Sequence, residues 1–265
     1  MFTDVSAERL AIYTREMAKG LAEKLFFLDH LPHGAGLLDF GCADGPLLEM
    51  VTHARPDLQL AGLDLSEAIL AKARARGLDA QWFTTQQAGA AWADGLRARG
   101  TPVVLLASSV LHEVHHYGGT SAWDAFWRFA HPAHFDGFAL RDFSITAADR
   151  GVEDPVFVEA VRRGLPLWQR ASFEGIWGPI TTRGHAVHAA LKAPWVDSWE
   201  REGPENYFPI DREEIAARLE HAYGPACMWD AHRLAFSNAD TLRRFGAELP
   251  CTTHLKALFG PVWTV

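Results

Sequence analysis

The chain is poor in cysteine and has no long apolar run. Its 265 residues include three cysteines, Cys42, Cys227 and Cys251, which are too few and too scattered for a disulfide framework or a cysteine zinc site. No stretch approaches the roughly 18 apolar residues that span a bilayer, and the segment Met1–Leu10 lacks the apolar run of a secretory signal. We therefore expect a cytoplasmic protein with no membrane partner.

Basic side chains are outnumbered by acidic ones. The chain has 25 Lys and Arg against 33 Asp and Glu, a formal net charge of −8. This balance argues against a nucleic-acid partner, because broad binding to phosphate backbones needs a concentrated basic surface. Apolar residues make up 48% of the chain, which is enough for a full core. The composition thus favours a globular protein with a small-molecule substrate, and it leaves a homodimer open.

Short apolar runs alternate with helical patterns over the first half of the chain. An amphipathic helix is expected first, over residues 6–30, and its Tyr13 is placed either to close over a ligand or to pack in the core. Strands without polar alternation, separated by helices, predict a parallel sheet covered on both faces. We expect strands at 37–40, 58–63, 81–83, 102–107 and 137–142, with helices near 47–51 and at 66–76, 88–99 and 121–130.

The alternation stops after Asp142 and resumes near the end of the chain. A helix is expected at 211–221, followed by strand-like segments at 227–236 and 253–259. The prediction is a doubly wound α/β domain with an insertion after its fifth strand, where an insertion commonly covers the ligand-binding edge of the sheet. The expected divisions are an N-terminal helical cap (1–34), a core (35–142), a substrate lid (143–210) and a C-terminal return to the sheet (211–265).

The turn between the first strand and its helix carries the main chemical signal. In Leu-Leu-Asp-Phe-Gly-Cys-Ala-Asp-Gly (37–45), Gly41 and Gly45 allow a tight turn and close approach of a ligand. Asp39 is placed to accept a hydrogen bond from a ligand ammonium. Asp64 ends the second strand, nineteen residues beyond Gly45, where a carboxylate binds ribose hydroxyls. Each feature alone also fits a plain turn or a helix cap, but together they predict a nucleoside cofactor.

The spacing argues against a dinucleotide. A dinucleotide fingerprint needs Gly-x-Gly-x-x-Gly, and Gly41-Cys-Ala-Asp-Gly45 lacks the last interval. Asp44 would also repel a pyrophosphate. A cofactor with a cationic or zwitterionic end fits better than a nicotinamide coenzyme.

This segment resembles motif I of the class I S-adenosylmethionine-dependent methyltransferases, and Asp64 matches their ribose-binding acid. Leu105–Glu113 is similar to their fourth strand and the segment bordering the methyl group, and the paired C-terminal segments resemble their reversed last strands. The resemblance covers 35–142 well and 211–260 loosely. It implies a Rossmann-like, mostly parallel seven-stranded sheet, with S-adenosylhomocysteine as the product.

Two positions depart from the family pattern. Ala43 stands where the family usually has a third glycine, and Thr85 and Gln86 replace its acidic residue beside adenine. The resemblance implies a set of cofactor-binding positions, which lie at the carboxyl ends of the first four strands. These are Asp39, Gly41, Cys42, Ala43, Gly45, Asp64, Leu65, Thr85, Gln86, Ser108 and Ser109.

His112-Glu-Val-His-His116 also fits the zinc motif His-Glu-x-x-His. Here it follows a buried strand directly, and Tyr117-Gly-Gly-Thr120 should end its helix within two turns, so we predict no zinc hydrolase. A metal held by some of these histidines within a methyltransferase site remains as an alternative. The four polar residues of the motif instead stand where the resemblance places the acceptor, and one of them is expected to be the general base. The candidates are His112, Glu113, His115 and His116, with solvated structural positions as the alternative.

Aromatic residues of the insertion suggest the substrate. Trp168, Trp177, Trp195 and Trp199, with Phe157 and Phe173, would wall a pocket for a small, partly aromatic molecule or else form a satellite core. The function predicted is methyl transfer from S-adenosylmethionine to an O, N or C nucleophile of such a molecule. A methyltransferase acting on nucleic acid or protein, and a catalytically silent cofactor-binding protein, remain as alternatives.

Overall fold

The fold is described from a computed structural model, which covers residues 21–263. Tyr13 and most of the helix predicted at 6–30 lie outside the described residues. Within them, the predicted continuation to residue 30 is wrong: α2 (Leu21–Lys24) ends early, and a separate 3-10 turn follows at Leu28–His30. The chain turns here because Phe27 and Leu28 are buried in the core. No helix among the described residues is long and apolar enough to cross a membrane.

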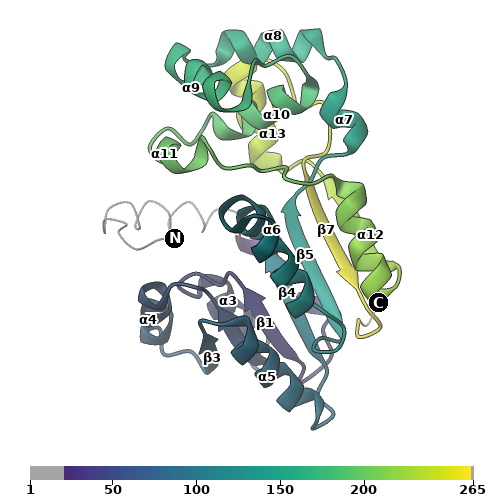
Figure 1. Cartoon of the computed structure of the whole chain (residues 1–265). Helices are drawn as coiled ribbons and strands as arrows, with labels where there is room; N and C mark the ends of the chain where they lie inside the picture. The colour runs from purple at the N-terminus through teal and green to yellow at the C-terminus, as the bar shows by residue number, and fades with distance from the viewer. Residues whose placement is uncertain (1–20, 264–265) are drawn as a thin grey trace. The chain divides into compact units, whose positions relative to one another are not determined.

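Seven strands form one mixed sheet in the order β3-β2-β1-β4-β5-β7-β6. The first five strands pair in parallel, whereas β7 is antiparallel to β6 and its arrow opposes that of β5 in Figure 1. The predicted seven-stranded α/β sheet is confirmed. The strands are β1 (Gly36–Phe40), β2 (Gln59–Leu63), β3 (Ala80–Phe83), β4 (Val103–Ser108), β5 (Gly137–Phe143), β6 (Ala226–His232) and β7 (His254–Phe259).

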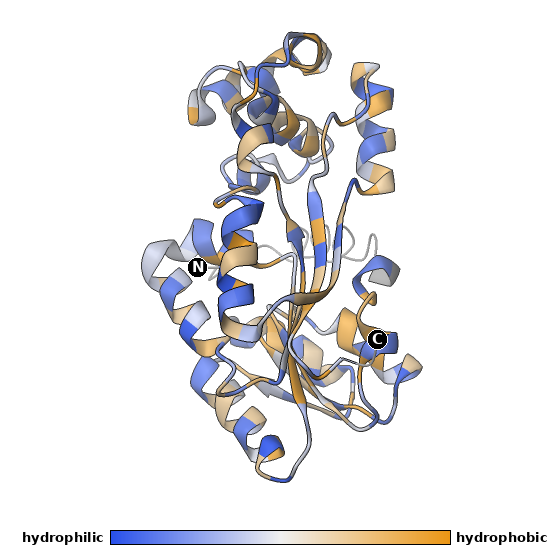
Figure 2. Cartoon of the chain, turned by 90° about the vertical axis from the view of Figure 1, so that its right-hand side faces the viewer, coloured by the Kyte–Doolittle hydropathy of each residue, from blue (hydrophilic) through white to orange (hydrophobic). Residues whose placement is uncertain are grey.

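Helices cover both faces of this sheet because successive strand residues point to opposite sides. Leu37 packs in the core cluster that contains Leu48 and Val51 of α3. On the other face, Phe40 makes ring contacts with Phe126 of α6 at a centroid distance of 4.9 Å. In Figure 2 the central strands are largely hydrophobic, while the helices alternate between hydrophobic and hydrophilic residues. The helices between the strands are α3 (Pro46–Ala54), α4 (Glu67–Ala75), α5 (Gln86–Arg97) and α6 (Leu111–Phe129).

The helix expected at 121–130 is present as the second part of α6, because non-helical dihedral angles at Gly119 (φ +63°) divide Leu111–Phe129 into two helices. One prediction of secondary structure is wrong in this half of the pattern. The strand expected at 227–236 ends at His232, and α13 (Ala235–Phe245) follows. No side chain caps α13 at Leu234, so the sequence carries no local signal for where that helix begins.

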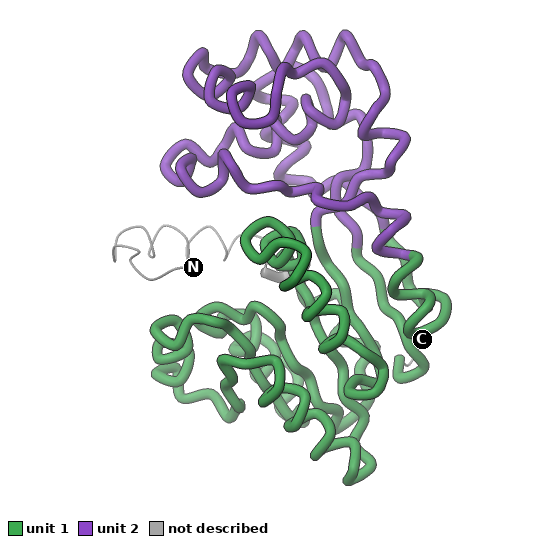
Figure 3. The backbone as a smooth tube through the Cα atoms, viewed as in Figure 1, with its two compact units in different colours: residues 1–142, 217–230, 256–265 green, residues 143–216, 231–255 purple. Residues whose placement is uncertain are grey.

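The chain divides into two compact units (Figure 3). Unit 1 contains 1–142, 217–230 and 256–265, and unit 2 contains 143–216 and 231–255. α12 (Arg212–Tyr223) belongs partly to each unit. The helices of unit 2 are α7 (Ala147–Gly151), α8 (Pro155–Gly164), α9 (Leu167–Trp177), α10 (Arg183–Lys192), α11 (Trp199–Glu202) and α13.

Unit 2 has a hydrophobic core of its own, centred on α10, in which every residue from Ala186 to Lys192 is buried. Phe157 and Phe173 lie fully inside this core, and Trp177 and Trp199 pack against it. Trp168 contacts the ring of Trp199 and remains half exposed. The aromatic residues of the predicted insertion therefore serve mainly as a satellite core.

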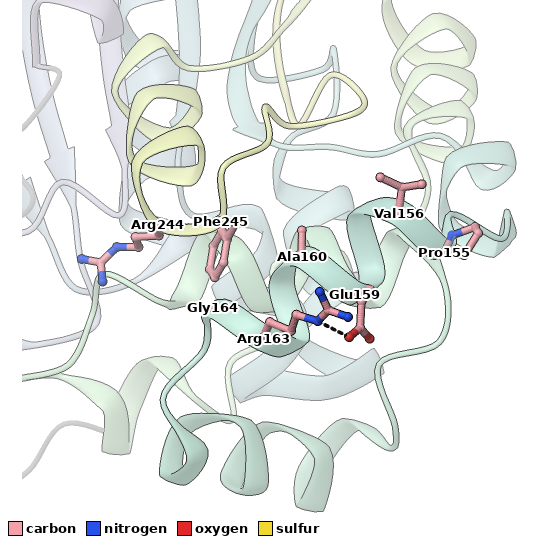
Figure 4. Close-up of a pocket in the computed structure, with 8 residues that line it drawn as sticks. All are labelled: Pro155, Val156, Glu159, Ala160, Arg163, Gly164, Arg244 and Phe245. Atoms are coloured by element: carbon pink, nitrogen blue, oxygen red, sulfur yellow. Dashed lines mark hydrogen bonds and ion pairs between the residues drawn. The ribbon is translucent and has the colours of Figure 1, made fainter.

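A surface pocket of about 680 Å³ lies between α8 and α13 of unit 2 (Figure 4). Arg163 lines it, but Glu159 pairs with that guanidinium at 2.5 Å. Arg244, on the other side, pairs with Asp240 at 2.6 Å. Both cations are neutralised by acids of their own helix, so the pocket offers no uncompensated charge to a ligand.

Arg55 stabilises the entry to β1. Its guanidinium donates to the carbonyl oxygens of Leu28 (2.9 Å) and Pro32 (3.1 Å), and it binds both carboxylate oxygens of Asp57. Asp57 in turn accepts from the backbone N–H of Gly34 at 2.9 Å. The hydrogen bonds from Arg55 hold the pKa of Asp57 well below its usual range.

We predict that Arg55→Met lowers the free energy of unfolding by about 2–3 kcal/mol, because it leaves several acceptors without their charged donor. Urea denaturation at pH 7 measures this change. The pKa of Asp57 is lower in the folded protein than in the unfolded chain. Its contribution to the free energy of unfolding is therefore full above the unfolded pKa of about 4 and is lost as the pH falls below that value. Arg99→Met, at an exposed arginine, is the control, and equal losses in the two variants would contradict the assignment.

Candidate functional site

The loop between β1 and α3 has an unusual backbone. Gly41, Ala43 and Gly45 all have positive φ, at +77°, +50° and +84°. A Cβ on Gly41 would lie 2.5 Å from Cγ2 of Val110, and one on Gly45 would lie 2.8 Å from the ring of Trp82. Ala43 adopts the left-handed conformation that favours glycine, which is the residue the resembled family usually has there. The loop is therefore held in a tight turn by its dihedral angles and by the side chains of Val110 and Trp82.

Asp64 joins this loop to the end of β2. Its Oδ2 accepts from the backbone N–H of Ala43 at 3.2 Å, and its Oδ1 accepts from that of Ser66 at 2.9 Å. Burial raises the pKa of Asp64, and these two N–H donors oppose the shift. Ser66 is the N-cap of α4, as predicted, so Asp64 is not needed to cap that helix. Each carboxylate oxygen keeps a further lone pair for another donor.

Asp44 has a partner that the sequence did not reveal. Arg76, after α4, lies 2.6 Å from Oδ2 of Asp44 and donates to its carbonyl oxygen at 2.5 Å. The same guanidinium pairs with Glu49 at 2.6 Å. The acid that was expected to repel a pyrophosphate is thus compensated, and only the glycine spacing still argues against a dinucleotide.

Asp39 lies buried near the end of β1. Burial raises its pKa to about 7, while the charge of Lys24 lowers it and that of Asp64 raises it further. Lys24, on α2, is itself buried, which lowers its pKa to about 8; Arg141 lowers that pKa further and Asp39 opposes the shift. The sequence pattern does not reveal Lys24 as a buried cation, because a helical lysine is normally solvated.

The other predicted cofactor residues lie at the same ends of the parallel strands. Cys42 is buried, which raises the pKa of its thiol far above the usual value and makes it unreactive. Thr85 caps α5 by accepting from the N–H of Ala88, and Gln86 begins that helix. Leu65, beside Asp64, leaves 82% of its surface exposed. The loops after β1, β2 and β3 therefore bring these residues to one edge of the sheet.

The loop after β4 is tied to β5 by two hydrogen bonds. Ser109, with φ +57°, donates its backbone N–H to the carbonyl oxygen of Arg141 at 2.6 Å. Its Oγ accepts from Nη1 of Arg141, also at 2.6 Å. Ser108 is buried, and its Oγ has no hydrogen-bond partner among the residues that the structure describes.

His112 is positioned by a carboxylate at the end of β5. Oδ1 of Asp142 lies 2.6 Å from Nδ1 of His112, and both groups are buried. Oδ2 of Asp142 accepts from the backbone N–H groups of Val110 (3.0 Å) and Leu111 (2.6 Å). Asp142 therefore caps α6 and orients the imidazole at the same time. Because an ionised carboxylate only accepts, Nδ1 must carry the proton, and Nε2 is the basic nitrogen of the neutral ring.

The other three candidate bases have different surroundings. The ring of His115 meets that of Trp123 edge-on at 5.5 Å, and the ring of His116 meets that of Tyr117 at 4.5 Å. Glu113 is half-buried one residue after His112. The helix beginning at Leu111 places His112, His115 and His116 on one face. The carboxylate of Asp142 orients the imidazole of His112.

No protein-family model and no curated protein matches the chain. Among solved structures, it is similar to the plantazolicin methyltransferase BpumL in complex with a triazolic desmethylPZN analog and SAH, with 13% identity over 97% of this chain and 92% of that one (TM-score 0.48). An O-methyltransferase family protein from Burkholderia thailandensis is 12% identical over 96% of this chain and 58% of its own (TM-score 0.48). The N-methyltransferase NodS from Bradyrhizobium japonicum is 13% identical over 94% and 96% (TM-score 0.39).

We predict that Asp142→Asn reverses the tautomer of His112. The amide oxygen must face the N–H groups of Val110 and Leu111, so the amide NH2 faces Nδ1 and donates to it, which moves the ring proton to Nε2. The ¹⁵N chemical shifts of the imidazole report this exchange.

Asp94→Asn is a matched control, because Asp94 contacts Nδ1 of His134 at an exposed site. It should leave the His112 signals unchanged. Identical His112 spectra in wild type and Asp142→Asn would show that Asp142 does not set the tautomer.

Proposed function

We propose that the chain is a methyltransferase that uses S-adenosylmethionine and acts on an oxygen, nitrogen or carbon nucleophile of a small molecule. The observation that carries the proposal is the loop with three positive φ angles, tied to Asp64 through the N–H of Ala43. That arrangement offers a tight backbone turn and a carboxylate side by side, which suits the sugar of a nucleoside.

The residues present fit the two polar ends of this cofactor. Asp64 would accept from the ribose hydroxyls, and Asp39 would accept from the ammonium of the amino-acid end. Leu65 exposes a large apolar surface beside Asp64, which suits contact with the base. Thr85 and Gln86 lie at the end of the neighbouring strand β3, where they would contact the polar edge of the base. When bound, S-adenosylmethionine supplies an activated sulfonium methyl group, so the protein has to align it, exclude water and remove a proton.

His112 is the residue best placed to remove that proton. Asp142 fixes Nδ1 as the donor side of the ring, which leaves Nε2 to accept a proton from a hydroxyl or amine as the methyl group moves. Asp142 also stabilises the imidazolium that results. Glu113, His115 and His116 lie on the same helix as His112, and we keep them in the proposal as alternative general bases beside the methyl acceptor.

The net charge of −8 supports a small acceptor and counts against a nucleic acid. The scarcity of cysteine supports a cytoplasmic location. Mass spectrometry of small molecules bound to the purified protein tests the central claim, and we expect S-adenosylmethionine or S-adenosylhomocysteine. Binding of a nicotinamide coenzyme instead would contradict it. Cofactor binding without S-adenosylhomocysteine formation across hydroxyl and amine acceptors would identify a silent binding protein.

We predict that Asp64→Ala weakens binding of S-adenosylhomocysteine by about 1.5–3 kcal/mol, because hydrogen bonds to a charged acceptor are lost. Isothermal titration calorimetry measures the change. Ser66→Ala is the control: it removes the cap of α4 but not the ribose acceptor, so affinity should persist. Wild-type affinity in Asp64→Ala would exclude the ribose contact.

We predict that affinity for S-adenosylhomocysteine rises with pH through about 7, because the buried carboxyl of Asp39 must ionise to accept the ligand ammonium. Lys24 and Asp64 are the charged groups that act on this titration. In Asp39→Asn the affinity should be lower and the step at pH 7 absent.

Asp39→Asn should also change how the stability of the fold depends on pH. The folded pKa of Asp39 lies above its unfolded value, so its stabilising effect is full at low pH and is lost as the pH rises through about 7. Asp39→Asn should therefore raise the melting temperature more at pH 8 than at pH 5. A step in affinity at pH 7 that survives in Asp39→Asn would assign the titration to another group.

A further inference from the structure

Arg141 and Ser108 form a buried polar pair that no step of the proposed mechanism uses. They are register partners on the parallel strands β4 and β5, so their side chains point to the same face of the sheet. Arg141 is 4% exposed and Ser108 is 7% exposed. Both stand near the carboxyl ends of their strands, where ligands bind in sheets of this kind.

The guanidinium of Arg141 is held by one of its ends. Nη1 donates to Oγ of Ser109, whose own backbone N–H returns to the carbonyl oxygen of Arg141. Ser109 makes both contacts from a positive φ of +57°, a conformation that a serine adopts only where its surroundings hold it there. The orientation of the guanidinium is therefore fixed.

The opposite edge of that guanidinium faces the carboxylate of Glu23 but makes no hydrogen bond to it. Nε is buried and has no hydrogen-bond partner within residues 21–263. Nη2 lies 3.9 Å from Oε2 of Glu23, which is too long for a hydrogen bond, and that oxygen likewise has no hydrogen-bond partner in the described chain. Nε–H and one N–H of Nη2 point in parallel and form the fork that binds a carboxylate through two hydrogen bonds.

Burial makes this edge without hydrogen bonds costly. A buried donor without an acceptor loses its hydration and gains nothing in return, and a buried guanidinium loses more than a neutral group does. The orphaned hydroxyl of Ser108 adds a second unsatisfied donor on the same face. A fixed fork and a hydroxyl that both lack an acceptor indicate that one is supplied from outside.

We propose that Arg141 and Ser108 bind the carboxylate of a ligand. Two ligands have this chemistry: the cofactor, through its amino-acid end, and an acceptor that carries an acid group. The first source rests on the proposed function. The position of Asp39 favours the cofactor as the source. Asp39 pairs in register with Leu106, which lies two residues before Ser108 on β4. The side chains of Asp39 and Ser108 therefore point to the same face of the sheet. A zwitterion with its ammonium at Asp39 and its carboxylate at Arg141 satisfies both groups.

The signal of the Nε–Hε group of Arg141, observed by ¹H–¹⁵N NMR and assigned with Arg141→Lys, tests the proposal directly. A shift on addition of S-adenosylhomocysteine, but not of 5′-methylthioadenosine, which lacks the amino-acid end, would assign the site to the cofactor. A shift caused by benzoate in protein saturated with S-adenosylhomocysteine would assign it to an acidic acceptor. A signal that none of these ligands moves would overturn the proposal.

Substitutions give an independent measurement. If the cofactor is the source, Arg141→Lys should weaken S-adenosylhomocysteine about 10- to 100-fold, because lysine keeps the charge but loses the fork, and Ser108→Ala should weaken it about tenfold. Both variants should bind 5′-methylthioadenosine as the wild type does, which controls for misfolding. If the acceptor is the source, the same losses should appear for benzoate. Unchanged affinities for both acids in Ser108→Ala and Arg141→Lys would reject the site.

The proposed function can fail separately. If wild-type protein binds neither S-adenosylhomocysteine nor 5′-methylthioadenosine, the methyltransferase proposal is wrong. The benzoate titration, run without cofactor, still decides whether Arg141 and Ser108 hold a carboxylate.

Discussion

The left-handed backbone of the loop after β1 is the constraint on which the candidate site depends. Gly41 and Gly45 cannot be replaced without a Cβ entering the side chains of Val110 or Trp82, so the turn is fixed by packing as well as by dihedral angle. Asp64 then holds the intervening Ala43 through its backbone N–H. One turn therefore fixes the distance between its own backbone and a carboxylate, which is the arrangement a nucleoside needs.

A second carboxylate organises the other half of the site. Asp142 satisfies two N–H groups at the start of α6 and the imidazole of His112, so the position of the helix and the tautomer of the histidine are set by the same group. The histidines of the motif His112-Glu-Val-His-His116 have different surroundings. His115 and His116 contact aromatic rings, whereas His112 is buried against an acid.

The parts of the fold that could be predicted rest on local patterns. The strands are continuous apolar runs such as Val103–Ala107, and the glycine turn lies within nine consecutive residues. What could not be predicted depends on residues distant in sequence: Arg76 reaches Asp44 across 32 positions, and Asp142 reaches Val110 across the same interval. The latter contact caps the start of α6. Lys24 and Arg141 were missed because periodicity indicates which face a residue occupies but not whether a cation there is buried.

The charges buried at the strand ends of unit 1 oppose folding. Desolvation lowers the pKa of both Lys24 and Arg141 and raises that of Asp39, so in each case the folded protein disfavours the charged form. Apolar side chains in these places would be as stable or more so, because a buried ion pair seldom recovers its full cost of desolvation. The rest of the core, with Leu37, Leu106 and Ala139 on the same sheet face, shows that the fold tolerates apolar residues there. A cluster that costs stability at one edge of an otherwise apolar face is best explained by a charged ligand that offsets the cost when it binds.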